Sequence, residues 1–190
     1  YSDAPDMLFR AYLTPAHAAT MFAVAGWMRE AGMHVEIDAA ANLIGRYEGW
    51  RDAPALLIGS HIDSVRDAGR YDGPLGVMLG IEAVAALREA GKRTPFPIEV
   101  VAFGDEEGSR FPASMLTSRA VAGMLDPATL DTLDRDGVSL AAALRLFNPD
   151  YDRIVSGAAL LPREALGIAG FAAAARAPGT VRAYLEAHIE

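Results

Sequence analysis

The sequence predicts an α/β domain built on a central sheet, with acidic residues and a histidine gathered at one edge of that sheet. Short apolar runs at 55–60 and 98–103 are typical of strands buried on both faces. Apolar residues at helical spacing before and between these runs predict helices that cover the sheet. The chain has 190 residues, of which 52% are hydrophobic and 22% charged, so it can bury a sizeable core and is not a disordered chain.

The expected elements place the polar clusters directly after strands. Pro15 favours a helix start and Gly32 a helix stop, which predicts a helix over residues 15–32. Further elements follow in chain order: strands at 34–38, 42–47 and 55–60, a loop at 61–71, a helix at 73–90, a strand at 98–103, a helical region from 126 onward, and a strand-like stretch at 181–188 that ends on His188. Ligands of open α/β sheets sit beyond the carboxyl ends of strands, which is where these polar residues fall.

Composition excludes several classes of protein. A net charge of −8 and scattered arginines argue against a nucleic-acid partner. Without cysteine, any metal must be held by His, Asp and Glu. No apolar run approaches the ~18–20 residues of a membrane span, and the N-terminus lacks a signal-peptide pattern, so we expect no membrane partner and a cytoplasmic location. The chain begins without Met and ends without a polar tail, so we expect a piece of a longer protein.

His61 and Asp63 form an H-x-D motif just after a predicted strand. Residues i and i+2 of an extended chain point the same way, so Asp63 can accept the ring N–H of His61 and make it a better metal ligand. The alternative is a surface histidine beside an acid by chance. His17 and His34 have no acidic motif next to them, and we expect both to be structural or solvent-exposed.

The remaining candidates are three acids and a second histidine. Asp72, at a helix start, is either an N-cap or a carboxylate that bridges two cations about 3.5–4 Å apart. On a loop, one of the adjacent residues Glu106 and Glu107 can bind a metal while the other takes a proton from water, although ordinary acidic loops are common. His188 is either a ligand or a packed core residue.

The glycine-rich stretch 73–80 superficially resembles a phosphate-binding loop. It lacks the lysine of that motif, and Asp72 would repel phosphate there, so close packing of a helix on the sheet is the better explanation. The sequence has no G-x-S-x-G motif, which argues against a serine hydrolase.

Five motifs occur in a fixed order: Gly59-Ser60-His61-Ile62-Asp63-Ser64-Val65, Gly69-Arg70-Tyr71-Asp72-Gly73-Pro74-Leu75-Gly76-Val77, Asp105-Glu106-Glu107-Gly108-Ser109-Arg110-Phe111-Pro112, Ser118-Arg119-Ala120 and Glu186-Ala187-His188-Ile189-Glu190. Together they resemble the carbamoyl- and ureido-group amidohydrolase branch of the binuclear zinc aminoacylase and carboxypeptidase-like metallopeptidases. That branch includes allantoate amidohydrolase, N-carbamoyl-L-amino acid hydrolase and β-ureidopropionase. The resemblance implies a three-layer α/β sandwich with a mostly parallel central sheet, as in zinc exopeptidases.

The resemblance also implies a role for each candidate. Two divalent cations are expected, Zn²⁺ or Mn²⁺, with Co²⁺ as a further option. His61 would bind one cation, Asp72 would bridge both, and Glu107 and His188 would bind the other. Glu106 would be the general base, helping to generate the attacking hydroxide, and Asp63 would orient His61. The implied activity is hydrolysis of a linear amide or ureido C–N bond in a small molecule, such as allantoate or an N-carbamoyl-L-amino acid.

In that family, residues 1–190 would form the N-terminal part of the catalytic metal-binding domain. A lid and dimerisation domain and a C-terminal catalytic segment would be absent, so we expect this piece alone to be inactive and the full-length protein to be a homodimer. Two alternatives remain open: an N-acyl amino acid deacylase or dipeptidase of the same superfamily, and a non-catalytic binding module on the same fold.

Overall fold

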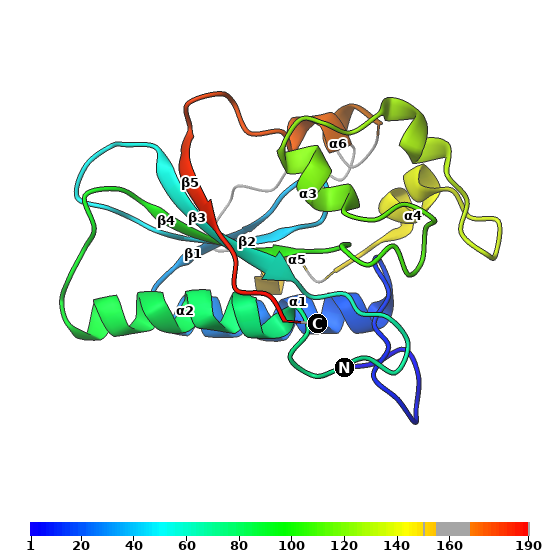
Figure 1. The fold of residues 1–190 in the computed structure, drawn as a ribbon, viewed down its shortest axis with the longest axis horizontal. Helices are drawn as coiled ribbons and strands as arrows, with labels where there is room; N and C mark the ends of the chain where they lie inside the picture. Colours follow the sequence, from blue (N-terminus) through cyan, green and yellow to red (C-terminus); the bar gives the residue numbers. More distant parts are fainter. Residues whose placement is uncertain (150, 155–167, 190) are drawn as a thin grey trace.

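A five-stranded sheet forms the centre of the molecule in the computed structural model, which describes residues 1–149, 151–154 and 168–189 (Figure 1). The strands are β1 (His34–Ile37), β2 (Leu43–Tyr47), β3 (Ala55–His61), β4 (Ile98–Phe103) and β5 (Val181–Leu185), in the spatial order β1-β2-β4-β3-β5. The helices are α1 (Pro15–Glu30), α2 (Pro74–Glu89), α3 (Leu116–Val121), the 3₁₀ helix η1 (Pro127–Asp131), α4 (Leu140–Leu146), α5 (Tyr151–Ile154) and α6 (Ile168–Ala173).

Most of the strands run in one direction. β3 is parallel to both of its neighbours, β4 and β5. β2 is antiparallel to both of its neighbours, β1 and β4, so within the described sheet β2 alone runs against the other four. The mostly parallel sheet expected from the sequence is therefore confirmed, with one reversed strand between β1 and β4.

Helices cover both faces of this sheet, which makes the fold a three-layer sandwich (Figure 1). α1 packs on β1 and β2, and α2 packs on β3 and β4. On β4, Val100 contributes to the apolar core with these helices, whereas Val101 and Phe103 belong to a second cluster that Val121 of α3 packs against. All six residues of β4 are buried, as expected for a strand covered on both faces.

Local sequence signals account for the ends of the two long helices. The Thr14 side chain accepts a hydrogen bond from the His17 backbone N–H and caps α1, with Pro15 in the first turn. Gly32 follows the end of α1 with φ of +86°, a conformation that suits glycine. Both helices lie where the sequence predicts them, to within two residues at each end.

The strand leading to His188 is shorter than expected. Its pairing with β3 ends at Ile58 and Leu185, and His188 lies three residues further on. Beyond the strand the chain passes close to α2: a side chain at Gly76 would collide with the carbonyl of Ala187. After Leu185 the chain therefore contacts α2 instead of pairing with β3. Glu190, the last residue of the fifth motif, lies outside the described residues.

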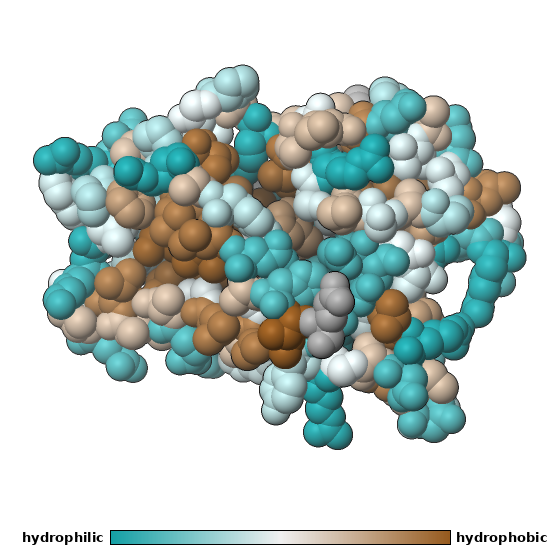
Figure 2. Space-filling model, in the orientation of Figure 1, coloured by the Kyte–Doolittle hydropathy of each residue, from teal (hydrophilic) through white to brown (hydrophobic). Residues whose placement is uncertain are grey.

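Other regions match the expectations less sharply. In the described residues, the helical pattern after residue 126 becomes the short elements η1, α4, α5 and α6. The face of the molecule in Figure 2 carries an apolar area over β3 and β5. On β5, Tyr184 is 45% and Leu185 55% exposed. Among the described residues, no helix is long and apolar enough to cross a bilayer.

Candidate metal centre

The site forms at the carboxyl ends of two parallel strands. β3 ends at His61 and β4 at Phe103, and these two residues are paired in register. The segments that follow them, 62–73 and 104–108, therefore start side by side. Asp72 is brought in by the return of the first segment to the start of α2, and His188 arrives after β5 on the other side of β3. This topology explains how residues more than 120 positions apart reach one place.

Three ligand atoms converge at almost equal distances. His61 Nε2 lies 3.4 Å from His188 Nε2 and 3.4 Å from Asp72 Oδ1, and His188 Nε2 lies 3.2 Å from Asp72 Oδ1. The resemblance implies that His188 shares a cation with Glu107. The geometry instead groups His188 with His61 and Asp72.

The tautomer of His61 follows from its surroundings. Its Nδ1 faces two acceptors of Asp63, the backbone carbonyl at 3.1 Å and carboxylate Oδ1 at 3.3 Å. Nδ1 must therefore carry the proton that is donated, which leaves the lone pair of a neutral His61 on Nε2. That lone pair points towards the carboxylate oxygen of Asp72, and two acceptors this close repel each other unless a cation or a proton lies between them.

Asp63 links His61 to both glutamates of the site. It is fully buried, and besides facing His61 it accepts the backbone N–H of Glu106 on Oδ1 at 3.0 Å and that of Glu107 on Oδ2 at 3.2 Å. One carboxylate thus holds both the ring of His61 and the backbone of the two glutamates. The H-x-D spacing predicts the first contact, but the contacts to the second loop come from the pairing of β3 with β4.

Glu106 and Glu107 lie on the loop after β4, where a second set of ligand atoms gathers. His61, Glu106 and Glu107 each offer an atom within 4.8 Å of the others. Oε1 of Glu107 is buried and has no hydrogen-bond partner in the part of the chain that the structure describes. Burial raises the pKa of Glu107, and the neighbouring carboxylates add to the effect.

The electrostatics of the cluster favour a bound positive charge. Burial alone would lower the pKa of His61, but the hydrogen bond and charge of Asp63, with the charge of Glu106, raise it to about 9. Asp105, which no sequence signal marked as a site residue, is fully buried beside these acids. Burial, together with the charges of its neighbours, raises its pKa to about 8. Buried carboxylates at this density need a proton or a metal cation to offset their repulsion.

Gly73 allows the backbone of the Asp72 loop to approach His61 closely. Its φ is +79°, and a Cβ at this position would lie 2.6 Å from the His61 ring. Gly73, not Asp72, is the N-cap of α2, and no side chain caps that helix. The capping alternative for Asp72 is therefore wrong. Gly80 lies against Ile58 and Val100 of the sheet, which confirms close packing as the role of the glycine-rich stretch.

The other two histidines lie away from this cluster. His17 is fully buried between Tyr12 and Phe147, and His34 is exposed at the start of β1. Both placements agree with the structural or solvent-exposed roles expected from the sequence.

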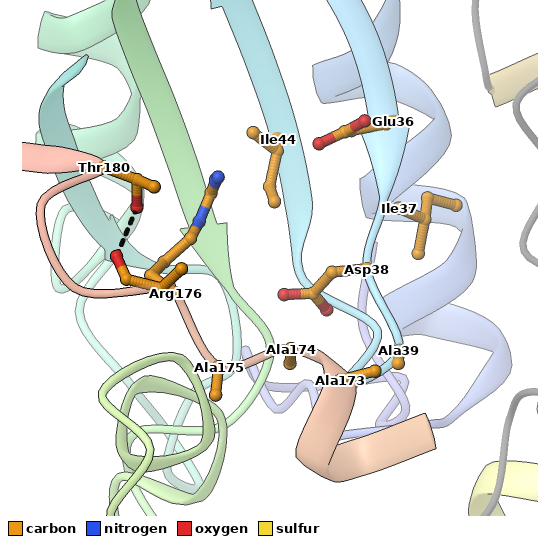
Figure 3. A pocket seen from close by; sticks show the side chains of 11 residues that line it. Glu36, Ile37, Asp38, Ala39, Ile44, Ala173, Ala174, Ala175, Arg176 and Thr180 are labelled. Carbon is orange, nitrogen blue, oxygen red and sulfur yellow. Dashed lines mark hydrogen bonds between the residues drawn. The ribbon is translucent and has the colours of Figure 1, made fainter. Parts of the chain in front are cut away.

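A cavity of about 490 Å³ lies elsewhere, between the β1–β2 region and the chain just after α6 (Figure 3). It contains none of the predicted site residues. Asp38 points into it, and burial raises the pKa of this carboxyl to about 6. Because Asp38 accepts hydrogen bonds from Ala40 and Asn42, it serves to close the turn between the two strands.

The residues of the main cluster fit a divalent cation. Ligands about 2.0–2.1 Å from a tetrahedral Zn²⁺ stand about 3.3–3.4 Å apart, which matches the separations of the His61, Asp72 and His188 atoms. Imidazole and carboxylate ligands without sulfur suit Zn²⁺, Mn²⁺ and Co²⁺. The unpartnered oxygen of Glu107 offers a further ligand next to this position.

This chain is similar to known proteins over most of its length. Residues 57–190 match the peptidase family M20/M25/M40. An N-carbamoyl-L-amino acid amidohydrolase of Geobacillus stearothermophilus is 51% identical over 168 residues, which cover 88% of this chain and 37% of that protein. An allantoate deiminase of Arabidopsis thaliana is 41% identical over 147 residues, which cover 76% of this chain and 28% of that protein.

A solved structure shares the fold. The hydantoinase/carbamoylase family amidase from Burkholderia ambifaria has a TM-score of 0.76 to this chain at 36% identity, covering 97% of this chain and 40% of that one. The chain thus spans two fifths or less of the length of these three relatives.

Proposed function

Because this chain belongs to the peptidase family M20/M25/M40, we propose that it supplies the N-terminal part of the catalytic domain of a two-metal hydrolase. The observation that carries this proposal is the convergence of His61 Nε2, His188 Nε2 and Asp72 Oδ1 within 3.4 Å of one another. These three residues would hold one cation, and Glu107 with Asp72 would hold the second. Zn²⁺ and Mn²⁺ are the leading candidates for both positions.

The proposed substrates are linear amides or ureido compounds. The named relatives act on N-carbamoyl-L-amino acids or allantoate, and this similarity favours a ureido C–N bond over the N-acyl amino acids and dipeptides of the alternative. The set of ligands favours an enzyme over a non-catalytic module, because a module would need none of them. The homodimer and the cytoplasmic location remain predictions from the sequence.

Each residue of the site has a distinct task in this proposal. Two bound divalent cations would polarise the substrate carbonyl and lower the pKa of a water molecule. Glu106 takes a proton from the attacking water and passes it to the leaving nitrogen. Asp63 fixes the Glu106 backbone and the His61 ring at the same time. The second cation position depends on Glu107, whose carboxylate oxygen is already free of other hydrogen bonds among the described residues.

The adjacent glutamates provide a matched test in the full-length protein that contains this chain. Glu106→Gln should retain both cations and lose about 10²–10⁴-fold in kcat, because the base is lost but no ligand is. Glu107→Gln should lose one cation. Metal content per chain and turnover of allantoate, N-carbamoyl amino acids, N-acyl amino acids and dipeptides give the readouts.

Three results would count against the proposal. Near-normal turnover by Glu106→Gln would show that another group is the base. Absence of bound cations from the parent protein under metal-replete conditions would favour the non-catalytic module. Faster hydrolysis of dipeptides or N-acyl amino acids than of ureido substrates would support the alternative activity.

A further inference from the structure

We propose that Glu186, held by the hydroxyl of Tyr184, is a positioning residue that orients His188 as a metal ligand. The inference rests on the proposed function, because it concerns the cation position formed by His61, Asp72 and His188. It assigns a role to Tyr184 and Glu186, which are neither proposed metal ligands nor the proposed general base.

Each histidine of the site has Nε2 towards the cation position and Nδ1 towards a carboxylate, and at His188 the Nδ1–carboxylate distance is longer than a hydrogen bond. Nε2 of His188 faces the cation position, and its Nδ1 lies 3.7 Å from Oε1 of Glu186. Nε2 of His61 faces the same position, and its Nδ1 lies 3.3 Å from Oδ1 of Asp63. Each carboxylate is two residues from its histidine, the spacing that puts two side chains of an extended segment on one side.

Such a carboxylate has a direct effect on a ligand histidine. A carboxylate facing Nδ1 keeps the proton on that nitrogen, so the lone pair of Nε2 is available to the cation. It also restrains rotation of the ring and makes the imidazole a stronger donor to the metal. For His188 this restraint is important, because its side chain is 34% exposed whereas that of His61 is 1% exposed.

Tyr184 anchors Glu186 to the sheet. Its hydroxyl donates a hydrogen bond to Oε2 of Glu186 at 2.7 Å, which leaves Oε1 directed towards His188. The centroid of the Tyr184 ring lies 6.3 Å from that of the Phe103 ring. The Tyr184 ring also packs over Gly59, where an added Cβ would lie 2.8 Å from the ring. Burial raises the pKa of Tyr184, and Glu186 raises it further, so the hydroxyl keeps its proton and remains a donor.

The chain from Tyr184 to His188 therefore ties the second histidine to the same strand that bears the first. Gly59 and His61 both belong to β3. The packing of Tyr184 on Gly59 therefore fixes the position of His188 relative to His61. The geometry gives a specific expectation: disturbing Glu186 should weaken the cation at this position and leave the Glu107 position bound.

The test uses the full-length protein with Glu186→Ala, Glu186→Gln and Tyr184→Phe. The matched control is Glu82→Gln, an exposed glutamate on α2. Zinc affinity is measured by competition with a chromophoric chelator, and the ligand field is followed by the visible absorption of the cobalt-substituted protein. Glu186→Ala should weaken one of the two cations by about 10–100-fold and change the cobalt spectrum. Glu186→Gln and Tyr184→Phe should weaken the same cation by less, and Glu82→Gln should change neither readout.

Unchanged zinc affinity and an unchanged cobalt spectrum in both Glu186 variants would overturn the inference. His188→Ala separates this outcome from a failure of the proposed function. If His188→Ala loses one cation while the Glu186 variants lose none, His188 is a ligand that needs no positioning residue. If His188→Ala retains both cations, the ligand set itself is wrong. Glu186→Gln preserves the shape of the side chain, so if Glu186→Ala fails to fold, the zinc affinity and cobalt spectrum of Glu186→Gln decide between these outcomes.

Discussion

Asp63→Asn is the most informative single substitution in the site, because it keeps the size of the side chain and removes its charge. The carboxylate meets three N–H donors: the His61 ring and the backbone amides of Glu106 and Glu107. An asparagine has only one oxygen, so in either orientation its NH₂ group faces at least one donor. Since Asp63 is fully buried, water cannot replace the lost partner.

The magnitude follows from these contacts. Losing one charge-assisted hydrogen bond costs about 1.5–3 kcal/mol, and leaving a buried donor unpaired costs about 1–3 kcal/mol. We therefore expect the free energy of unfolding of the metal-free protein to fall by about 3 kcal/mol or more. Cation affinity should fall by about 10–100-fold, because the His61 ring loses the carboxylate that orients it. The pKa of His61, raised to about 9 chiefly by Asp63, should fall as well.

Urea unfolding in the presence of a chelator measures the first effect, chelator competition the second, and an NMR titration of the His61 ring the third. Asp126→Asn is the matched control. Asp126 accepts the Ala128 backbone N–H as the N-cap of η1, an exposed contact that asparagine can replace, so stability should change by less than about 0.5 kcal/mol. If Asp63→Asn unfolded at the same urea concentration as the parent and bound metal equally well, Asp63 would not hold the site together.

Two further predictions concern residues around the site. His17 is fully buried and its pKa is lowered to about 3 by burial and the charge of Arg10, so the unfolded chain binds the extra proton first as pH falls below about 6.5. Its contribution to stability is present above pH 6.5 and is lost towards pH 3. In urea unfolding, the parent should lose about 2 kcal/mol of unfolding free energy between pH 7.5 and pH 5 relative to His17→Gln. A difference between parent and variant that stays constant with pH would refute the argument. Gly73→Ala should lower cation affinity, because its Cβ would lie 2.6 Å from the His61 ring, whereas Gly91→Ala shares a positive φ but meets no neighbour within 4 Å. Equal cation affinity in these two glycine variants would show that the contact with His61 is unimportant.

Features encoded by neighbouring residues could be predicted from the sequence. Periodicity located α1, α2 and the buried strands, and Pro15 and Gly32 marked helix ends through their own backbone preferences. The order of the five motifs identified the family, which the match over residues 57–190 confirms. The H-x-D spacing also predicted the contact between Asp63 and His61, because it depends only on extended backbone.

Contacts between distant segments were decided by the tertiary structure. The parallel register of β3 and β4 lets Asp63 hold both glutamate amides, and it also buries Asp105 beside them. Pairing of β5 with β3 brings His188 to His61 across 127 residues, which is why the geometry groups it there and not with Glu107. Sequence by itself determined which residue types stand at the strand ends. Only the pairing of the strands decided which of those residues meet, because register and sheet order depend on burial of whole faces and not on any short stretch of chain.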